Sequence, residues 1–247
     1  MIKKLQTGGT ADQYQKAKKW TTDYVNSPKY KERLTKQVNT EKMLDGGAEL
    51  ASPSSIIKKR SEVLNYVKPE YVKGDIANTK GLLGDYSSAD SILRIRTDLG
   101  DATPTLVHEL SHATLNGDAP FSTKFNDSYV NKLMVQPGGS KFTNRWDPYL
   151  QKPTEIKGRL DSLRYQMKSK GIYDAGTQDF SSEHLQKMRA DKDIVNSEDY
   201  KSLESQLPQG RKDYGMSWLM NNIAKNKQTS TLATYAKDGG VLRKYIK

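Results

Sequence analysis

A predicted helix that carries two histidines four residues apart constrains the fold of this chain more than any other feature. The sequence TPTLVHELSHATLNG begins with Thr103 as a helix cap, followed by a proline at the first helical position. Asn116 and Gly117 end the apolar pattern and provide a stop. On such a helix, His108 and His112 project from one face. The back of the helix is apolar, which predicts that it packs on a core: Leu106, Leu110, Ala113.

The segment from His108 to His112, HELSH, has the HExxH form, in which two imidazoles one helical turn apart can bind the same metal ion. Glu109 lies beside them, where its carboxylate can take a proton from a water that the metal polarises. The chain has three histidines in 247 residues, and two of them stand at this spacing. The pattern therefore predicts a catalytic zinc site with Glu109 as the general base of a peptidase.

A catalytic zinc site needs a third protein ligand besides the two histidines, and an open fourth position. Cysteine is absent from the chain, so histidine and carboxylate are the ligand types that remain. We favour Glu155, which stands 43 residues after His112 at the start of a predicted amphipathic helix. Arg159 follows one turn later and could orient the carboxylate of Glu155.

Two other residues remain candidates for the third ligand. Asp118 lies six residues after the second histidine, where longer zinc-binding motifs place their last ligand, although Leu115 stands where those motifs need a glycine. His184 is the third histidine, and it could instead donate a hydrogen bond to the oxyanion of a tetrahedral intermediate. The donor role is also open to two tyrosines, Tyr165 and Tyr173.

The remaining pattern predicts a mainly helical α+β fold with a small mixed sheet packed on the motif helix. Apolar residues recur at helical spacing on both sides of Ser27 and Pro28, which predicts one helix from residue 11 to this pair and a second over 28–37. We interpret residues 1–50 as an N-terminal helical hairpin and residues 51–247 as a zincin-like domain that carries the motif.

Strands are predicted close to the motif helix in the sequence. In SILRIRT, Leu93 and Ile95 alternate with the residues of a second face, which indicates a strand. Other predicted elements are a strand over 81–86, helices over 153–170, 183–192 and 216–225, loops over 118–151 and 173–182, and a stretch of mixed character over 56–67.

The chain is strongly basic, with a net charge of +11 and a pI near 9.5. Such a charge favours acidic neighbours. The lysines are spread over predicted helices without a basic-aromatic recognition module, so we do not expect nucleic acid as a specific ligand. Residues 1–10 lack the apolar stretch of a secretory signal and no run reaches membrane-spanning length, so we expect neither secretion nor a membrane partner.

The motif HELSH (His108 to His112), together with PTEIKGRL (Pro153 to Leu160), resembles the zincin metallopeptidases of the gluzincin type. The resemblance implies a zincin fold in which His108, His112 and Glu155 hold Zn²⁺, and a peptide or protein as the substrate. It also implies that the strand before the motif helix, SILRIRT, pairs with extended substrate. Arg159 departs from the family pattern, since many gluzincins have an acidic residue at that position.

The chain also resembles predicted zinc peptidases of crAss-like phages of gut bacteria, in the opening KKLQTGG, in YVNSPKYKERL, and in the pairing of HELSH with a later PTEI. This resemblance implies synthesis in the host cytoplasm. It also implies an alternative to hydrolysis, in which the chain is a virion protein of the neck or tail and its zincin fold serves assembly with other virion proteins.

Overall fold

The computed structural model describes residues 7–44, 52–76, 79, 81–98, 100–116, 153–207 and 210–222, which form a mainly helical α+β fold with one small sheet. The helices before the sheet are α1 (Thr7–Val25), α2 (Pro28–Leu44) and α3 (Pro53–Tyr66). The strands are β1 (Lys68–Val72), β2 (Gly84–Ser87) and β3 (Ile92–Arg96). After them come α4 (Thr103–Asn116), α6 (Pro153–Ser169), α7 (Ser182–Ala190), α8 (Lys192–Asn196), α9 (Glu198–Gln206) and α10 (Lys212–Asn221).

The sheet is mixed, and β3 lies in its centre. The strand order is β1-β3-β2, with β1 parallel and β2 antiparallel to β3. The predicted alternation in β3 is confirmed: Leu93 and Ile95 are fully buried. On the other face, Arg94 lies 3.2 Å from both Glu70 of β1 and Asp85 of β2, so its guanidinium forms ion pairs with both neighbouring strands.

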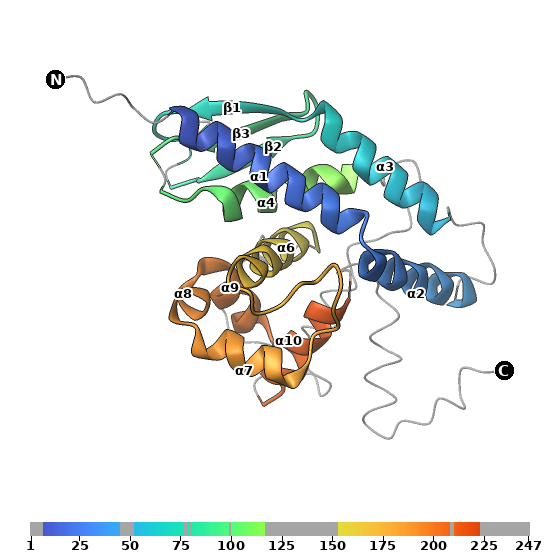
Figure 1. The fold of residues 1–247 in the computed structure, drawn as a ribbon. Coiled ribbons are helices and arrows are strands. Elements are labelled where there is room, and N and C mark those ends of the chain that lie inside the picture. The colour runs from blue at the N-terminus through green and yellow to red at the C-terminus, as the bar shows by residue number, and fades with distance from the viewer. Residues whose placement is uncertain are drawn as a thin grey trace.

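Helix α4 is the central element of the fold. It contacts β2 and β3 on one side and α6 on another, and it also packs against α1 and α3. Figure 1 shows the sheet, α4 and α6 stacked in that order, with the later helices beyond α6. The apolar residues of α4 are fully buried: Leu106, Val107, Leu110 and Ala113. The histidine-bearing helix is therefore held between the sheet and α6, and the predicted packing of a small sheet on this helix is confirmed.

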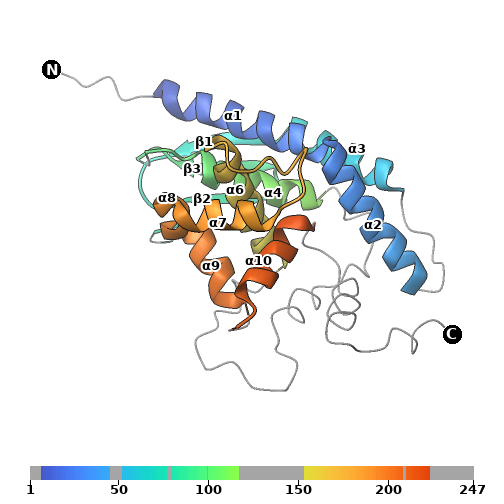
Figure 2. The same cartoon turned by 60° about the horizontal axis from the view of Figure 1, so that its bottom comes forward.

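Helix α1 contributes an aromatic stripe to this core. Tyr14, Ala17, Trp20 and Tyr24 are buried and belong to one hydrophobic cluster with residues of α4 and α6. The rings of Trp20 and Tyr24 stack at 5.1 Å. Figure 2 shows α1 running along one side of the molecule, with α2 and α3 at one end of it. The division of the chain into two domains at residue 50 stays a prediction.

Helix α4 begins at Thr103, the residue predicted as its start. The backbone N–H of Thr103 donates to Oδ1 of Asp101 at 3.0 Å. Helix α6 follows its prediction closely and ends before Gly171, which has a φ of +67°. Glycine adopts this left-handed conformation at little cost, so its position stops the helix.

Several elements differ from the sequence-based expectation. The stretch of mixed character is the helix α3, capped by Ser52, and the chain turns extended at Val67 to form the unpredicted strand β1. The predicted helix over 183–192 is divided at Asp191, which ends α7 and whose side chain accepts the first N–H groups of α8. Helix α2 extends to residue 44, α9 was not predicted, and α10 begins four residues early. The predicted loop over 118–151 lies outside the described residues.

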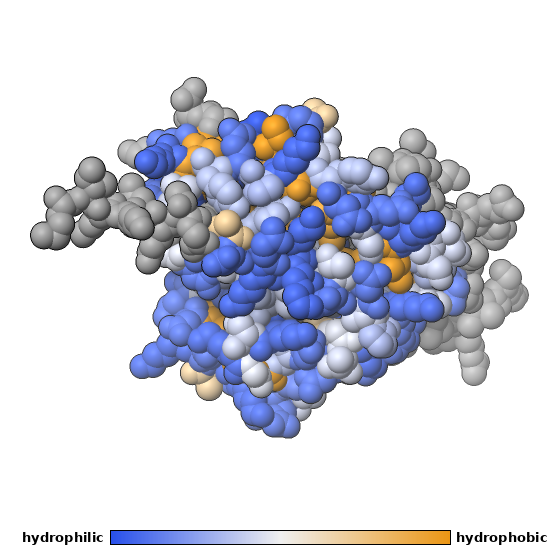
Figure 3. Space-filling model, turned by 45° about the horizontal axis from the view of Figure 1, so that its top comes forward, coloured by the Kyte–Doolittle hydropathy of each residue, from blue (hydrophilic) through white to orange (hydrophobic). Residues whose placement is uncertain are grey.

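The described surface is polar. Figure 3 shows one face that is mostly hydrophilic, with small separate apolar spots. Tyr66, Tyr71 and Leu83 are the large apolar side chains that the described part of the chain exposes. In the ranges that the structure describes, no helix combines the length and the apolar character needed to cross a bilayer.

Candidate metal centre

The three predicted metal ligands come together where α4 packs on α6. One oxygen of Glu155 lies 3.4 Å from Nε2 of His108, and the other lies 3.4 Å from Nε2 of His112. The ligand atoms of the three residues all lie within 4.8 Å of one another. Among the described residues, this is the one group of histidine and acidic side chains with the spacing of a metal site.

The spacing of this group suits a single metal ion. Each histidine nitrogen lies 3.4 Å from one oxygen of Glu155, close to the separation of about 3.3–3.4 Å between two ligands that are about 2.0–2.1 Å from a tetrahedral metal centre. Two imidazoles and one carboxylate are also a donor set found in catalytic zinc sites. The side chains of His108 and His112 are 12% and 16% exposed, so the group is sheltered without being sealed.

Gly158 allows the close approach of the two helices at this point. A Cβ atom at position 158 would lie 2.8 Å from Nε2 of His108, closer than real side chains come. Glycine in the middle of a helix costs roughly 0.5–1 kcal/mol relative to alanine. The imidazole of His108 therefore occupies the space that any other residue at position 158 would fill, a requirement that the sequence pattern did not reveal.

A buried charge network next to the ligands holds α6 against α4. Nζ of Lys157 donates to Oγ of Ser111 and to Oδ2 of Asp161, both at 2.7 Å. Ser111 also donates to Asp161 at 2.7 Å. Arg164 donates to the other oxygen of Asp161 at 3.0 Å. Because Lys157 follows Glu155 by two residues, this network fixes the register that brings Glu155 to the histidines.

Glu109 is buried between α4 and the sheet. It accepts a backbone hydrogen bond from Tyr86 of β2, and Gly84 at the start of β2 leaves room for its side chain, since a Cβ there would lie 3.1 Å from Cγ of Glu109. Burial raises the pKa of Glu109 to about 7, against the opposing charge of His108. A carboxylate with a pKa near neutrality suits general-base work, and a bound cation would favour its ionised form.

The two histidines differ in their electrostatic surroundings. Burial, together with the charge of His108, lowers the pKa of His112 to about 3, so His112 is neutral at neutral pH and can offer its lone pair. Burial also disfavours the charged form of His108, but Glu155, Glu109 and Asp199 outweigh it and raise its pKa. The same carboxylates would also attract a cation bound at this site.

Asp199 of α9 is a neighbour of the site that sequence reasoning missed. Its carboxylate accepts hydrogen bonds from Ser162 at 2.6 Å and from Gln166 at 3.0 Å, and it interacts electrostatically with His108. No local pattern marks this residue, because α9 meets α6 only through the tertiary fold. It supplies His108 with an acidic neighbour from a different helix than α4 and α6.

The other candidate residues are placed elsewhere or lie outside the described ranges. His184 is a helix-capping residue: its Nδ1 accepts from the backbone N–H of Ser181 at 3.0 Å in the capping box of α7. Tyr173 packs on that ring and receives a hydrogen bond from Arg33. Tyr165 packs edge-on against Trp20. Asp118 lies outside the described residues.

Two expectations about the surroundings of the site are wrong. The ion-pair partners of Arg159 are Glu198 and Asp199, each at 3.8 Å, so Arg159 does not orient Glu155. Strand β3 cannot pair with extended substrate, because β1 and β2 already occupy both of its edges. The strand that lies next to α4 with one edge unpaired among the described strands is β2.

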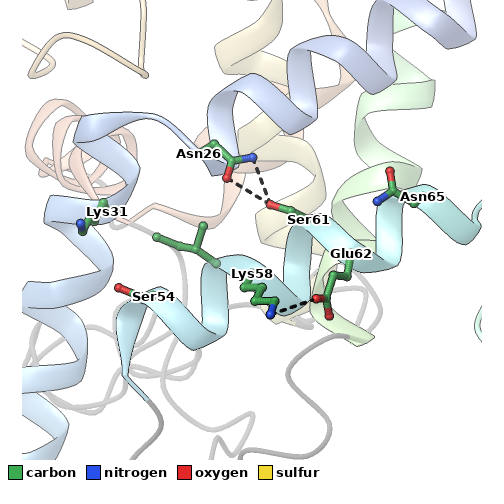
Figure 4. Close-up of a pocket in the computed structure, with 8 residues that line it drawn as sticks. Asn26, Lys31, Ser54, Lys58, Ser61, Glu62 and Asn65 are labelled. Atoms are coloured by element: carbon green, nitrogen blue, oxygen red, sulfur yellow. Dashed lines mark hydrogen bonds and ion pairs between the residues drawn. The ribbon is translucent and has the colours of Figure 1, made fainter.

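A separate hollow lies between α2 and α3, away from the metal centre. It has a volume of about 550 Å³, and Figure 4 shows its polar lining, where Asn26 contacts Ser61 and Lys58 pairs with Glu62. None of its lining residues belongs to the metal-binding group. This hollow therefore does not extend the candidate site.

The structure thus shows a sheltered group of two histidines and a glutamate that could hold a metal ion. Comparisons with protein-family models, with curated proteins and with solved structures give no significant match to this chain.

Proposed function

We propose that this protein is a zinc-dependent peptidase of the gluzincin type. The observation that carries the proposal is the meeting of His108, His112 and Glu155 at ligand spacing, with the base Glu109 next to the first histidine. A purely structural metal site has no use for such a base. The mixture of nitrogen and oxygen donors in a cysteine-free chain also favours zinc held in a catalytic arrangement.

A zinc ion bound by these residues would supply Lewis acidity to a water and to the substrate carbonyl. Glu109 would take a proton from the water as its oxygen adds to the carbonyl carbon. Glu109 would then give that proton to the peptide nitrogen as the carbon–nitrogen bond breaks. One water is consumed, and the products are a carboxylate and an amine.

The substrate would lie along β2. An extended peptide can add to a free sheet edge through backbone hydrogen bonds. Strand β2 is such an edge in the described part of the sheet, and the backbone N–H of Tyr86 points to Glu109. A peptide on this edge would therefore pass beside both the base and the metal ligands.

The proposal is tested by zinc content and hydrolysis together. The purified full-length protein should carry about one zinc per chain by elemental analysis. Both His112→Ala and Glu155→Ala should lose the zinc. Full zinc content in Glu155→Ala would instead assign the third ligand to Asp118 or His184.

Hydrolysis is measured on denatured casein with zinc-loaded protein. The Glu109→Gln variant should keep its zinc and lose hydrolysis, whereas the exposed Glu62→Gln control should keep both. A wild-type protein that binds zinc but never cleaves would argue against a peptidase and for the virion assembly role. A protein without zinc under metal-replete conditions would refute the metal site itself.

A further inference from the structure

Arg159 differs from the other deeply buried arginines of the described chain in having few partners. Arg33 donates three hydrogen bonds, to Ala175, Tyr173 and Gln178. Arg164 donates four, one to Asp161 and three to backbone carbonyls of α10 and its C-terminal cap. All three arginines have a buried Nε without a partner, but in the same described ranges Arg159 has no hydrogen bond from its terminal nitrogens either.

The unmet hydrogen bonds of Arg159 are costly. Only 8% of the residue is exposed, and its Nε is fully buried, so water cannot take the place of the missing partner of this nitrogen. Each buried polar group without a partner costs about 1–3 kcal/mol, and more for a charged one. The nearest carboxylates, Glu198 and Asp199, lie at 3.8 Å from Nη1, beyond hydrogen-bond distance. A buried guanidinium in this state is poised to accept an anionic partner.

The position of Arg159 connects it to the metal centre. Residues four apart share a face of a helix, so Arg159 lies one turn along α6 on the face that carries Glu155. Its charge interacts with His112. Its neighbour Asp199 interacts with His108. A ligand that contacts the metal centre would therefore have Arg159 at its side.

We propose that Arg159 is a specificity-determining residue that binds a carboxylate of the peptide substrate. The guanidinium offers parallel N–H groups in a planar fork, which matches the two oxygens of a carboxylate. The carboxylate is either the C-terminus of the peptide or an acidic side chain next to the cleaved bond. This inference rests on the proposed peptidase function for the nature of the ligand.

Binding to the uncleaving Glu109→Gln protein tests the inference without relying on activity. The probes are four acetylated tetrapeptides with one backbone. One is neutral with a C-terminal amide, one has a free C-terminal carboxylate, and two are amides with an internal glutamate or lysine. Calorimetry on the zinc-loaded and metal-free forms should show at least one carboxylate peptide binding about tenfold more tightly than the neutral one. The lysine peptide should bind no more tightly than the neutral one.

When Arg159→Gln is added to the Glu109→Gln protein, the preference for the carboxylate peptide should disappear. The matched control is Lys168→Gln, which removes one positive charge from a 45% exposed side chain of the same helix and should leave the preference intact. If Arg159→Gln does not fold, Arg159→Lys takes its place, since it keeps the charge and loses the planar fork; the preference should then fall well below that of the parent.

Two results would overturn the inference: equal binding of all four peptides by the parent, or an unchanged carboxylate preference in the Arg159 variants. The position of the carboxylate that gains affinity distinguishes the C-terminus from the side chain. The metal-free arm separates this inference from the proposed function, because Arg159-dependent binding is measurable even if no zinc is bound.

Discussion

The imidazole of His108 lies against Gly158 of α6, where a Cβ atom would come within 2.8 Å of Nε2. Glycine is otherwise a poor choice in the middle of a helix, where alanine is better by roughly 1 kcal/mol. The contact indicates that position 158 serves the approach of α4 and α6 instead of the stability of α6.

We therefore expect Gly158→Ala to weaken zinc binding by at least about tenfold, because the added methyl group displaces His108 or pushes α6 away. Zinc affinity is measured by competition with a chromophoric chelator. Gly215→Ala is the matched control: it also sits in a helix and would press on Leu207, but it is not part of the metal-binding group. Unchanged zinc affinity in Gly158→Ala would show that the site does not depend on this contact.

Asp199 should strengthen the binding of a metal by the histidines. We expect Asp199→Asn to lower zinc affinity by about tenfold, because a carboxylate that interacts with His108 favours positive charge at the site. The exposed Asp193→Asn, which loses a pair with Lys170, serves as the control in the same chelator assay and should bind zinc as the parent does. Equal zinc affinities in the two variants would show that Asp199 does not contribute to metal binding.

His184 should matter for stability alone. Its ring accepts a hydrogen bond from the backbone N–H of Ser181, the N-cap of α7, and loss of one such hydrogen bond costs about 0.5–1.5 kcal/mol. His184→Ala should therefore lower the free energy of unfolding by this amount and leave zinc content at the wild-type level. Loss of zinc in this variant would revive His184 as a ligand.

The buried Asp161 should make the protein sensitive to acid. Burial opposes its charge, but Lys157 and Arg164 outweigh burial and lower its pKa in the folded protein. The ionised Asp161 therefore contributes its full share to the free energy of unfolding at pH values above about 3.9, the pKa of aspartate in the unfolded chain. This share is lost as the pH falls through the lower pKa that Asp161 has in the folded protein.

In Asp161→Asn, two buried cations lose their carboxylate, so we expect a loss of about 3–5 kcal/mol at neutral pH. The variant should also lose less stability than the parent on acidification. Urea unfolding of the metal-free proteins between about pH 7 and pH 3 measures both effects. The exposed Asp23→Asn, which breaks a surface pair with Lys19, should change stability by less than about 1 kcal/mol. A parent and an Asp161→Asn variant with parallel pH profiles would contradict the assignment.

The helices that bear the ligands were predictable from local signals. Thr103, Pro104 and Asn116 mark the ends of α4, and the spacing of apolar residues marks α6 with its stop at Gly171. The prediction that Glu155 meets the two histidines used the chemistry of zinc sites more than any local pattern, and the structure brings the three side chains together.

The elements that were missed depend on contacts between distant residues. Strand β1 holds Pro69 and shows little burial, so its only strong signal is the pairing with β3, which lies more than twenty residues later. The central position of β3 could not be predicted for the same reason, because it depends on which other strands pair with β3 and not on the residues of β3 itself. Gly158 has the local sequence signal of a weak helix position, and Arg159 that of a partner for Glu155 one turn earlier. Their actual contacts come from the packing of α4 and α9 on α6.

The division of the candidate ligands between α4 and α6 would couple zinc binding, as proposed, to folding. A chain in which α6 has separated from α4 would keep a two-histidine chelate but lose its carboxylate, so it would bind zinc less well than the native state. Zinc at about 100 times its dissociation constant would then add up to about 2.7 kcal/mol to the apparent stability. The melting temperature would report the free zinc concentration, and a strong chelator would lower the stability of this protein.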